Sequence, residues 1–154
     1  MWNALAIILH LLAINVWVGG TFFSVVILKH AATSLEPSQQ LRLMQVIFRR
    51  FFFWIWIAIL VLLSSGGWMV YSIFGSIGTA PRYIVLMVVL ALLMMTVFVV
   101  IFFGPYRQFQ KSLALEDIAS SQRQLAWIGL LSTINMVLGV CVVLVIGGGP
   151  HFLV

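Results

Sequence analysis

The chain has 154 residues, of which 64% are hydrophobic and 7% are charged, whereas a soluble globular domain carries about 25% charged residues. This composition predicts an all-α integral membrane protein and excludes an ordinary soluble enzyme. The net charge of +5 comes from basic residues that flank hydrophobic stretches, which indicates topology and contact with anionic lipid rather than nucleic-acid binding. At this length we expect a single transmembrane domain, residues 1–154.

The first predicted span, residues 2–28, contains no formal charge and is longer than the roughly 20 residues that cross a bilayer. It includes His10 and Asn15, two polar side chains that are costly to place in hydrocarbon. Each should therefore have a protein partner, a water-filled cavity or a bound ligand. His10 is the first candidate for a functional residue.

After a short polar loop, the Glu36-Pro37-Ser38 segment has the proline expected at the first position of a helix. From Pro37 the chain can run as one long helix. Its opening part, residues 37–50, places apolar and polar side chains on different sides, which predicts an interfacial helix that then enters the membrane. Arg49 and Arg50 mark its boundary as interfacial anchors, and the second span follows over residues 51–74. Its Ser-Ser-Gly-Gly segment, residues 64–67, has small side chains that allow another helix to approach closely.

The third span is predicted over residues 83–104, because Gly104-Pro105 is expected to stop it. We expect a short surface helix within the polar residues 106–124. The fourth span covers residues 126–148 and ends at the glycine-rich Gly147-Gly148-Gly149-Pro150. The prediction is therefore a transmembrane four-helix bundle.

Seven of the eight lysine and arginine residues lie in or beside the loops that follow the first and third spans, and Arg82 alone lies on the other side. Such a bias places those loops on the cytoplasmic side. Both termini should then face the periplasm of a bacterial inner membrane. The lipid bilayer is the partner that this topology requires.

Four side chains are expected in the outer half of the bundle, one in each span: His10, Met69, Met87 and Cys141. Imidazole, thioether and thiolate are ligands that suit Cu(I). The alternative is ordinary packing, because methionine and cysteine also fill apolar cores. The single cysteine excludes an intramolecular disulfide and a Cys-x-x-Cys metal pair.

Haem b is a competing ligand for His10, since axial imidazoles are common in four-helix bundles. His30 lies about 30 Å farther along the first helix, so it cannot supply a second ligand within one chain. His151 lies beyond the fourth span. A haem would need a different second ligand, a folded-back His151, or a second protomer.

A purely structural role remains the third possibility, in which His10 is hydrogen-bonded to a neighbouring backbone group or serine. Asn15 and Asn135 lie near the middle of their spans, and each has a glycine four residues later, Gly19 and Gly139. We expect these two helices to pack closely, with the amides bonded to each other for about 1 kcal/mol. No enzyme constellation is present, since the spans contain no carboxylate and no phosphate-binding loop.

The sequence resembles the CopD (copper-resistance D) family of bacterial membrane proteins. The resemblance rests on HLLAINVWVGGTFF from His10, on LRLMQVIFRRFFFWIWIAILVLLSSGGWMV from Leu41, on FFGPYRQF from Phe102 and on INMVLGV from Ile134. Its most specific parts are the spacing of His10, Trp17, Gly19 and Gly20 and the Arg-Arg-Phe segment before tryptophan. It implies a minimal four-helix inner-membrane protein connected with copper uptake or tolerance.

A weaker similarity links the chain to HemJ-type protoporphyrinogen oxidases, which are four-helix haem-associated proteins with a histidine in the first helix and a lysine in the third. Here the third span has neither lysine nor histidine, which argues against that catalysis. We therefore expect a non-enzymatic copper-handling protein. A homodimer or a periplasmic copper protein is a possible partner, and haem binding and an assembly role are the alternatives.

Overall fold

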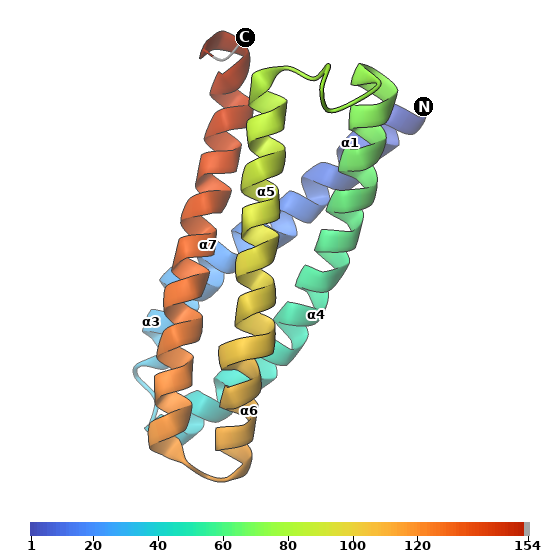
Figure 1. The fold of residues 1–154 in the computed structure, drawn as a ribbon. Coiled ribbons are helices and arrows are strands. Elements are labelled where there is room, and N and C mark those ends of the chain that lie inside the picture. The colour runs from blue at the N-terminus through green and yellow to red at the C-terminus, as the bar shows by residue number, and fades with distance from the viewer. Residues whose placement is uncertain (153–154) are drawn as a thin grey trace.

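The computed structural model describes the backbone of residues 1–152 and the side chains of residues 1–149. In this part of the chain, four helical rods are long and apolar enough to cross a membrane. They run alternately up and down, so that the start of the first rod and the end of the last lie at the same end of the bundle (Figure 1). The predicted four-helix membrane protein is confirmed.

The first rod is continuous from Trp2 to Ala32, although its helical geometry changes along its length. Two wider π-helical segments interrupt the α-helix, and both lie where the rod crosses the bundle diagonally (Figure 1). The rod consists of α1 (Trp2–Ile14), η1 (Asn15–Gly19), α2 (Gly20–Phe22), η2 (Phe23–Leu28) and α3 (Lys29–Ala32). It exceeds the predicted residues 2–28 by one turn.

The second rod comprises α4 (Pro37–Met69) and η3 (Val70–Phe74). As expected, the chain runs from Pro37 as one long helix, and residues 37–50 are its first part. Their apolar face is buried in the bundle, since Leu41, Met44 and Phe48 are at most 4% exposed. With this face covered by protein and no proline or glycine at Arg49-Arg50, the helix continues without a break into the membrane.

The third rod comprises α5 (Arg82–Ile101), η4 (Phe102–Tyr106) and α6 (Arg107–Ala114). The prediction that Gly104-Pro105 ends this helix is wrong, because Pro105 lies inside the π-helical η4. Proline normally clashes with the carbonyl one turn earlier, and the wider π turn changes that geometry. The short helix expected within residues 106–124 is present as α6, but it continues the third rod instead of forming a separate surface helix.

The fourth rod is α7 (Ile118–Phe152). Asp117 begins it, and the backbone N–H of Ser120 donates a 2.9 Å hydrogen bond to the Asp117 carboxylate. This hydrogen bond lowers the pKa of Asp117, as expected for a carboxylate at a helix N-terminus. The glycine-rich residues 147–149 do not end α7, because lipid and neighbouring helices allow glycine and proline within membrane helices.

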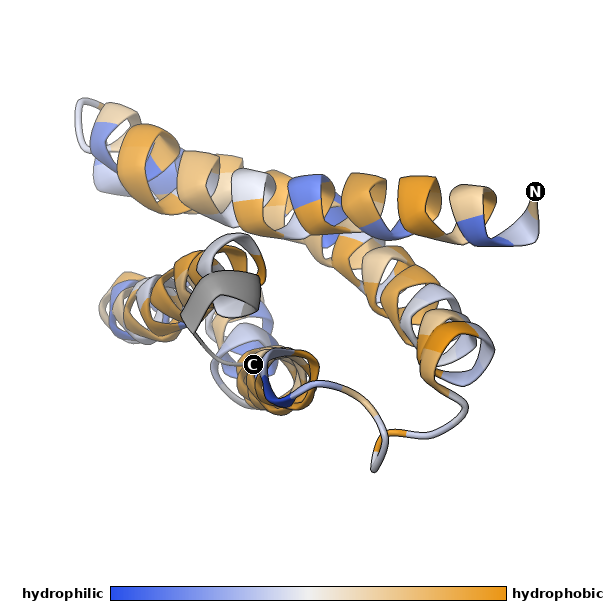
Figure 2. Cartoon of the chain, turned by 90° about the horizontal axis from the view of Figure 1, so that it is seen from above, coloured by the Kyte–Doolittle hydropathy of each residue, from blue (hydrophilic) through white to orange (hydrophobic). Residues whose placement is uncertain are grey.

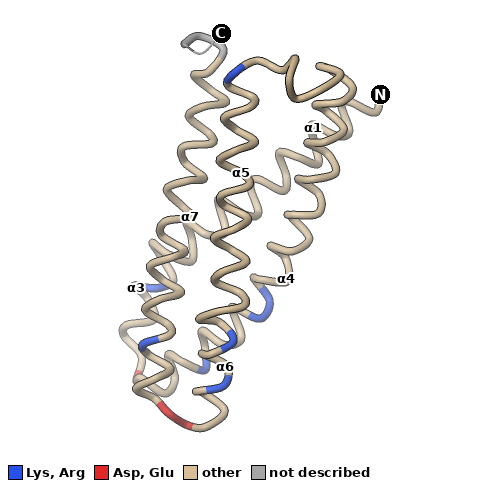
Figure 3. The backbone as a smooth tube through the Cα atoms, in the orientation of Figure 1, with Lys and Arg blue, Asp and Glu red and all other residues tan. Residues whose placement is uncertain are grey.

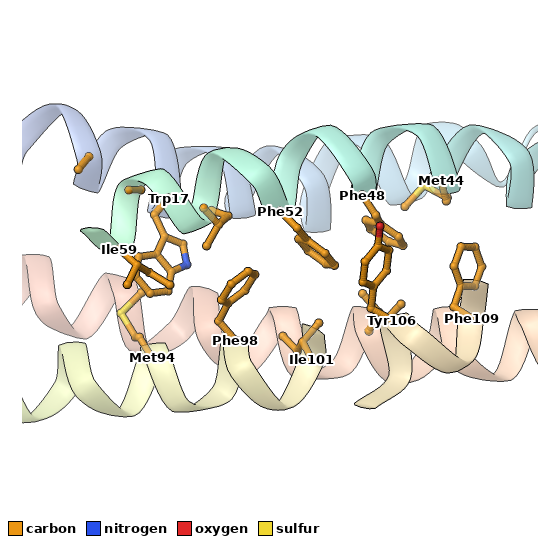
Figure 4. Close-up of a cluster of buried hydrophobic side chains, with 14 of the residues drawn as sticks. Trp17, Met44, Phe48, Phe52, Ile59, Met94, Phe98, Ile101, Tyr106 and Phe109 are labelled. Atoms are coloured by element: carbon orange, nitrogen blue, oxygen red, sulfur yellow. The ribbon is translucent and has the colours of Figure 1, made fainter. Parts of the chain in front are cut away.

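The rods form two closely packed pairs, α1 with α4 and α5 with α7. Aromatic side chains fill the space between the pairs in the half of the bundle toward α6 (Figure 4). Phe52 is central to this cluster: its ring centroid lies 4.8 Å from that of Tyr106, 5.5 Å from that of Phe98 and 5.4 Å from that of Phe48. These large rings explain how the two pairs are held together.

Hydrophobic residues predominate along the rods (Figure 2), and many large apolar side chains are exposed. Leu60 and Leu144 are each 66% exposed and Phe53 is 61% exposed. Exposed apolar surface of this extent is rare on soluble monomers, and it is what contact with lipid requires. The structure is that of a multi-pass membrane protein.

Candidate functional site

Polar contacts fix the antiparallel register between α1 and α4. Near the termini, Asn3 Oδ1 accepts hydrogen bonds from Trp68 Nε1 at 3.0 Å and from Ser72 Oγ at 3.1 Å. His10 lies seven residues after Asn3 on α1, and its ring contacts Ser65, which lies seven residues before Ser72 on the second rod. Seven residues make two helical turns, so both contacts lie along one line where the helices meet.

His10 is held directly against the small-residue segment of α4. Its Nδ1 lies 2.9 Å from Ser65 Oγ. A Cβ atom on Gly66 would lie 3.2 Å from His10 Cε1, so the glycine gives the imidazole the space it occupies. The predicted close approach of another helix at Ser-Ser-Gly-Gly is confirmed, and that helix is α1.

The hydrogen-bond partners of Ser65 assign the tautomer of His10. Ser65 Oγ lies 2.5 Å from the carbonyl oxygen of Val61, and a carbonyl can only accept, so the serine hydroxyl donates its single hydrogen there. Nδ1 of His10 must then donate its hydrogen to Ser65 Oγ. In the neutral ring this leaves Nε2 with a free lone pair, the form in which imidazole binds metals.

The other predicted donors are distributed over both helix pairs. Met69 lies on α4 one turn beyond Ser65, and the register places it opposite Ala6, which is one turn before His10 on α1. Met87 lies on α5 and Cys141 on α7, in the other helix pair. Across the residues that the structure describes, no cluster of three or more histidine, cysteine, aspartate or glutamate side chains could hold a metal ion.

His30 does not lie near this contact. His30 is exposed at the opposite end of the first rod, where its Nδ1 donates to the carbonyl oxygen of Val26 at 2.8 Å. The side chain of His151 lies outside the part of the chain described in atomic detail. Among the histidines whose side chains the structure describes, His10 is thus the one inside the bundle.

The predicted bond between Asn15 and Asn135 is wrong. Asn15 is exposed on the first rod and donates from Nδ2 to the carbonyl oxygen of Leu11 at 3.0 Å. Asn135 is 3% exposed, and its Oδ1 has no hydrogen-bond partner within the described residues. The two amides therefore do not meet, since Asn15 bonds within its own helix and Asn135 is buried on α7.

The helices nevertheless meet where glycines were expected, with different partners. A Cβ atom on Gly139 would lie 2.9 Å from Val18 Cγ2, whereas a Cβ atom on Gly19 would have no neighbour within 4 Å. Gly20 faces Phe51, whose Cε2 atom would be 2.6 Å from an added Cβ. The close contact of the first rod is therefore made by Val18 with α7 and by Gly20 with α4.

Trp17, Arg49 and Arg50 differ in their surroundings. Trp17 is 3% exposed and packs edge-on against Phe98, with 6.2 Å between ring centroids. Arg49 and Arg50 are exposed on α4, at the end of the bundle where the basic side chains gather (Figure 3). Their position is consistent with the predicted interfacial anchors.

The sequence predicted a backbone group or a serine as a structural partner for His10, but it did not identify Ser65. The signal was available in the small residues 64–67, which were interpreted only as a place of close approach. A serine in such a segment also supplies a hydroxyl, and an intramembrane histidine needs a hydrogen-bond partner. What the sequence lacked was the register that brings Ser65, rather than Ser64, to His10.

These features define a class: a four-helix membrane protein that carries one oriented histidine at the contact between its first two rods. A family model described as Copper resistance protein D (CopD) matches residues 45–148, which is two thirds of the chain. The chain belongs to the CopD family. No curated protein and no solved structure gives a significant match.

The matched residues begin within α4 and end in α7. They include Ser65 but not the first rod, and therefore not His10. The resemblance noted from the sequence is confirmed over residues 45–148. The link between His10 and the family segment is provided by the contact with Ser65.

Proposed function

We propose that this CopD-family membrane protein handles copper, in uptake or tolerance, and that Nε2 of His10 binds Cu(I) as the transported or sequestered ion. The family description supports the first part. The second part rests on one observation, the hydrogen-bond chain from His10 Nδ1 through Ser65 Oγ to the carbonyl oxygen of Val61. This chain orients the imidazole and leaves Nε2 available.

Met69 is the donor that we place beside His10. Its helix faces α1, and it is one turn from Ser65 on the same side of α4. A thioether and an imidazole together favour the soft Cu(I) ion. Met87 and Cys141 belong to the α5–α7 pair, so we propose that they take part only if the two helix pairs move together.

The proposed orientation places both termini in the periplasm of a bacterial inner membrane. The blue lysine and arginine segments support it, because they gather at the end of the bundle away from the termini, and Arg82 is the exception (Figure 3). Under the positive-inside rule that end is cytoplasmic. His10 then lies in the outer half, within reach of copper from the periplasm, delivered by a copper protein there or taken up by a homodimer.

Copper binding by purified variants tests the proposal. Cu(I) would be titrated into the protein in detergent in competition with a chromogenic chelator. We expect His10→Ala to abolish stoichiometric binding and Met69→Leu to weaken it. His30→Ala should bind as the parent does, because His30 lies at the opposite end of its rod. Equal binding by His10→Ala and the parent would refute a role for His10 in holding copper.

Haem b is the second candidate, favoured by the same free Nε2, which is the atom that an axial imidazole uses. Copper binding and haem binding predict different absorption spectra. If haem is bound, the purified protein shows a Soret band that His10→Ala removes, and copper has no effect on it. If neither chromophore nor copper is found, and His10→Ala lowers stability alone, the role of His10 is helix packing in a structural or assembly subunit.

A further inference from the structure

A second feature lies where the first rod meets α7. A hollow of about 270 Å³ opens between this rod and α7. Val18, Gly19 and Phe22 belong to one wall, which also carries the polar Asn15, and Met136 and Val140 belong to the other. Gly19, Phe22 and Val140 are exposed, so the hollow is an open, mainly apolar groove at the surface that faces lipid.

The same two helices bring a charge into line with this groove. Lys29 Nζ lies 3.5 Å from the position that a Cβ atom on Gly129 would occupy. Gly129 precedes Met136 by seven residues on α7, which is two turns, so the two residues share a face of that helix. The ammonium group is thus positioned at the cytoplasmic-side continuation of the groove, about 10 Å from Met136 along the helix.

The lysine is not neutralised by the protein. In the described part of the chain no carboxylate forms an ion pair with Lys29, and the acidic residues Glu36, Glu116 and Asp117 lie in or beside the loops. Trp127 is exposed two residues before Gly129, and tryptophan marks the membrane interface. The anion that a bilayer offers to an interfacial ammonium is a lipid phosphate.

We propose that this groove binds an anionic phospholipid of the leaflet at the lysine- and arginine-rich end of the bundle. Its phosphate contacts Lys29, and one acyl chain lies between the first rod and α7 against Phe22, Met136 and Val140. The lack of a side chain at Gly129 leaves the space that the ammonium occupies. The arrangement matches that of a lipid molecule, because the ammonium of Lys29 lies at the interface, where the phosphate is, and the apolar groove lies toward the membrane centre, where the acyl chain is.

Native mass spectrometry of the detergent-solubilised protein tests this site. The probes are phosphatidylglycerol and phosphatidylcholine with identical acyl chains, and the readout is the fraction of protein that retains one lipid. We expect the parent to prefer phosphatidylglycerol, and Lys29→Gln to weaken that binding about fivefold, the change that corresponds to one basic residue near a membrane surface. Lys111→Gln removes an exposed charge at the same end and should change binding much less.

A second variant tests the groove without altering charge. Gly19→Leu places a side chain where an added Cβ has no neighbour within 4 Å, so it should fold and fill part of the groove. We expect it to lower retention of phosphatidylglycerol while Lys29 is intact. Equal losses in Lys29→Gln and Lys111→Gln would overturn the site in favour of diffuse surface attraction. Equal retention of both lipids by the parent would also overturn it, and so would a dimer whose interface covers the groove.

Discussion

Replacing Ser65 with alanine tests the hydrogen-bond chain that orients His10. The substitution removes the acceptor for Nδ1, which lies 2.9 Å away, and the group that connects the ring to the Val61 carbonyl oxygen. Ser65 is 6% exposed, so water cannot readily replace the hydroxyl. A free Nδ1–H in hydrocarbon then favours other ring orientations and the other tautomer.

Two magnitudes follow from this geometry. An interhelical hydrogen bond in a membrane contributes about 0.6 kcal/mol on average and roughly 2 kcal/mol at most, so we expect Ser65→Ala to lower the free energy of unfolding by about 1 kcal/mol. Removing the partner that orients a metal-binding histidine typically costs about 10–100-fold in metal affinity. The affinity for Cu(I) should therefore fall far more than stability does.

The neighbouring serine supplies a matched control. Ser64 is exposed, and its hydroxyl donates to the carbonyl oxygens of Leu60 and Val61 within its own helix. Ser64→Ala should leave both quantities close to those of the parent. Stability would be measured by denaturant unfolding in mixed micelles, and affinity by the chelator competition described above. If Ser65→Ala and Ser64→Ala behave alike, the proposed orientation of His10 through Ser65 is refuted.

Two further predictions concern packing and topology. Gly20→Ala should lower the free energy of unfolding by about 1–3 kcal/mol, because its Cβ would lie 2.6 Å from the Phe51 ring. Gly19→Ala should be neutral, because its Cβ meets no atom within 4 Å. Thermal unfolding in detergent distinguishes the two variants, and equal effects would contradict the packing described. A periplasmic reporter such as alkaline phosphatase should be active when fused after residue 154 and inactive when inserted between Leu115 and Glu116, and the reverse pattern would show that the orientation is wrong.

The sequence by itself determined the class of the protein. Four apolar stretches, each long enough to cross a bilayer, require four membrane helices, because backbone groups in hydrocarbon must bond within their own segment. The resemblance to the CopD family could also be identified from residues alone, as the family match over residues 45–148 confirms. The intramembrane position of His10 likewise follows from hydropathy and its place in the first span.

The partners of the polar side chains were decided by the tertiary structure. The position of Asn15 and Asn135 along their helices follows from the sequence, but the packing of the rods leaves Asn15 exposed, with its amide bonded to the Leu11 carbonyl oxygen, and buries Asn135. Pro105 shows the same limitation, since it was expected to end a helix and instead lies within η4. Predictions from local sequence assume α-helical geometry, whereas the packed bundle has a π-helical turn at this position.

The contact between His10 and Ser65 depends on the register of two rods separated by 55 positions in the sequence. Either serine of the Ser-Ser-Gly-Gly segment could serve as an acceptor, and only the antiparallel register, fixed also at Asn3 and Ser72, selects Ser65. The groove beside Lys29 arises in the same way, from the meeting of the first rod with α7. Hydropathy determines that a helix enters the membrane, whereas side-chain packing between helices determines which atoms meet there.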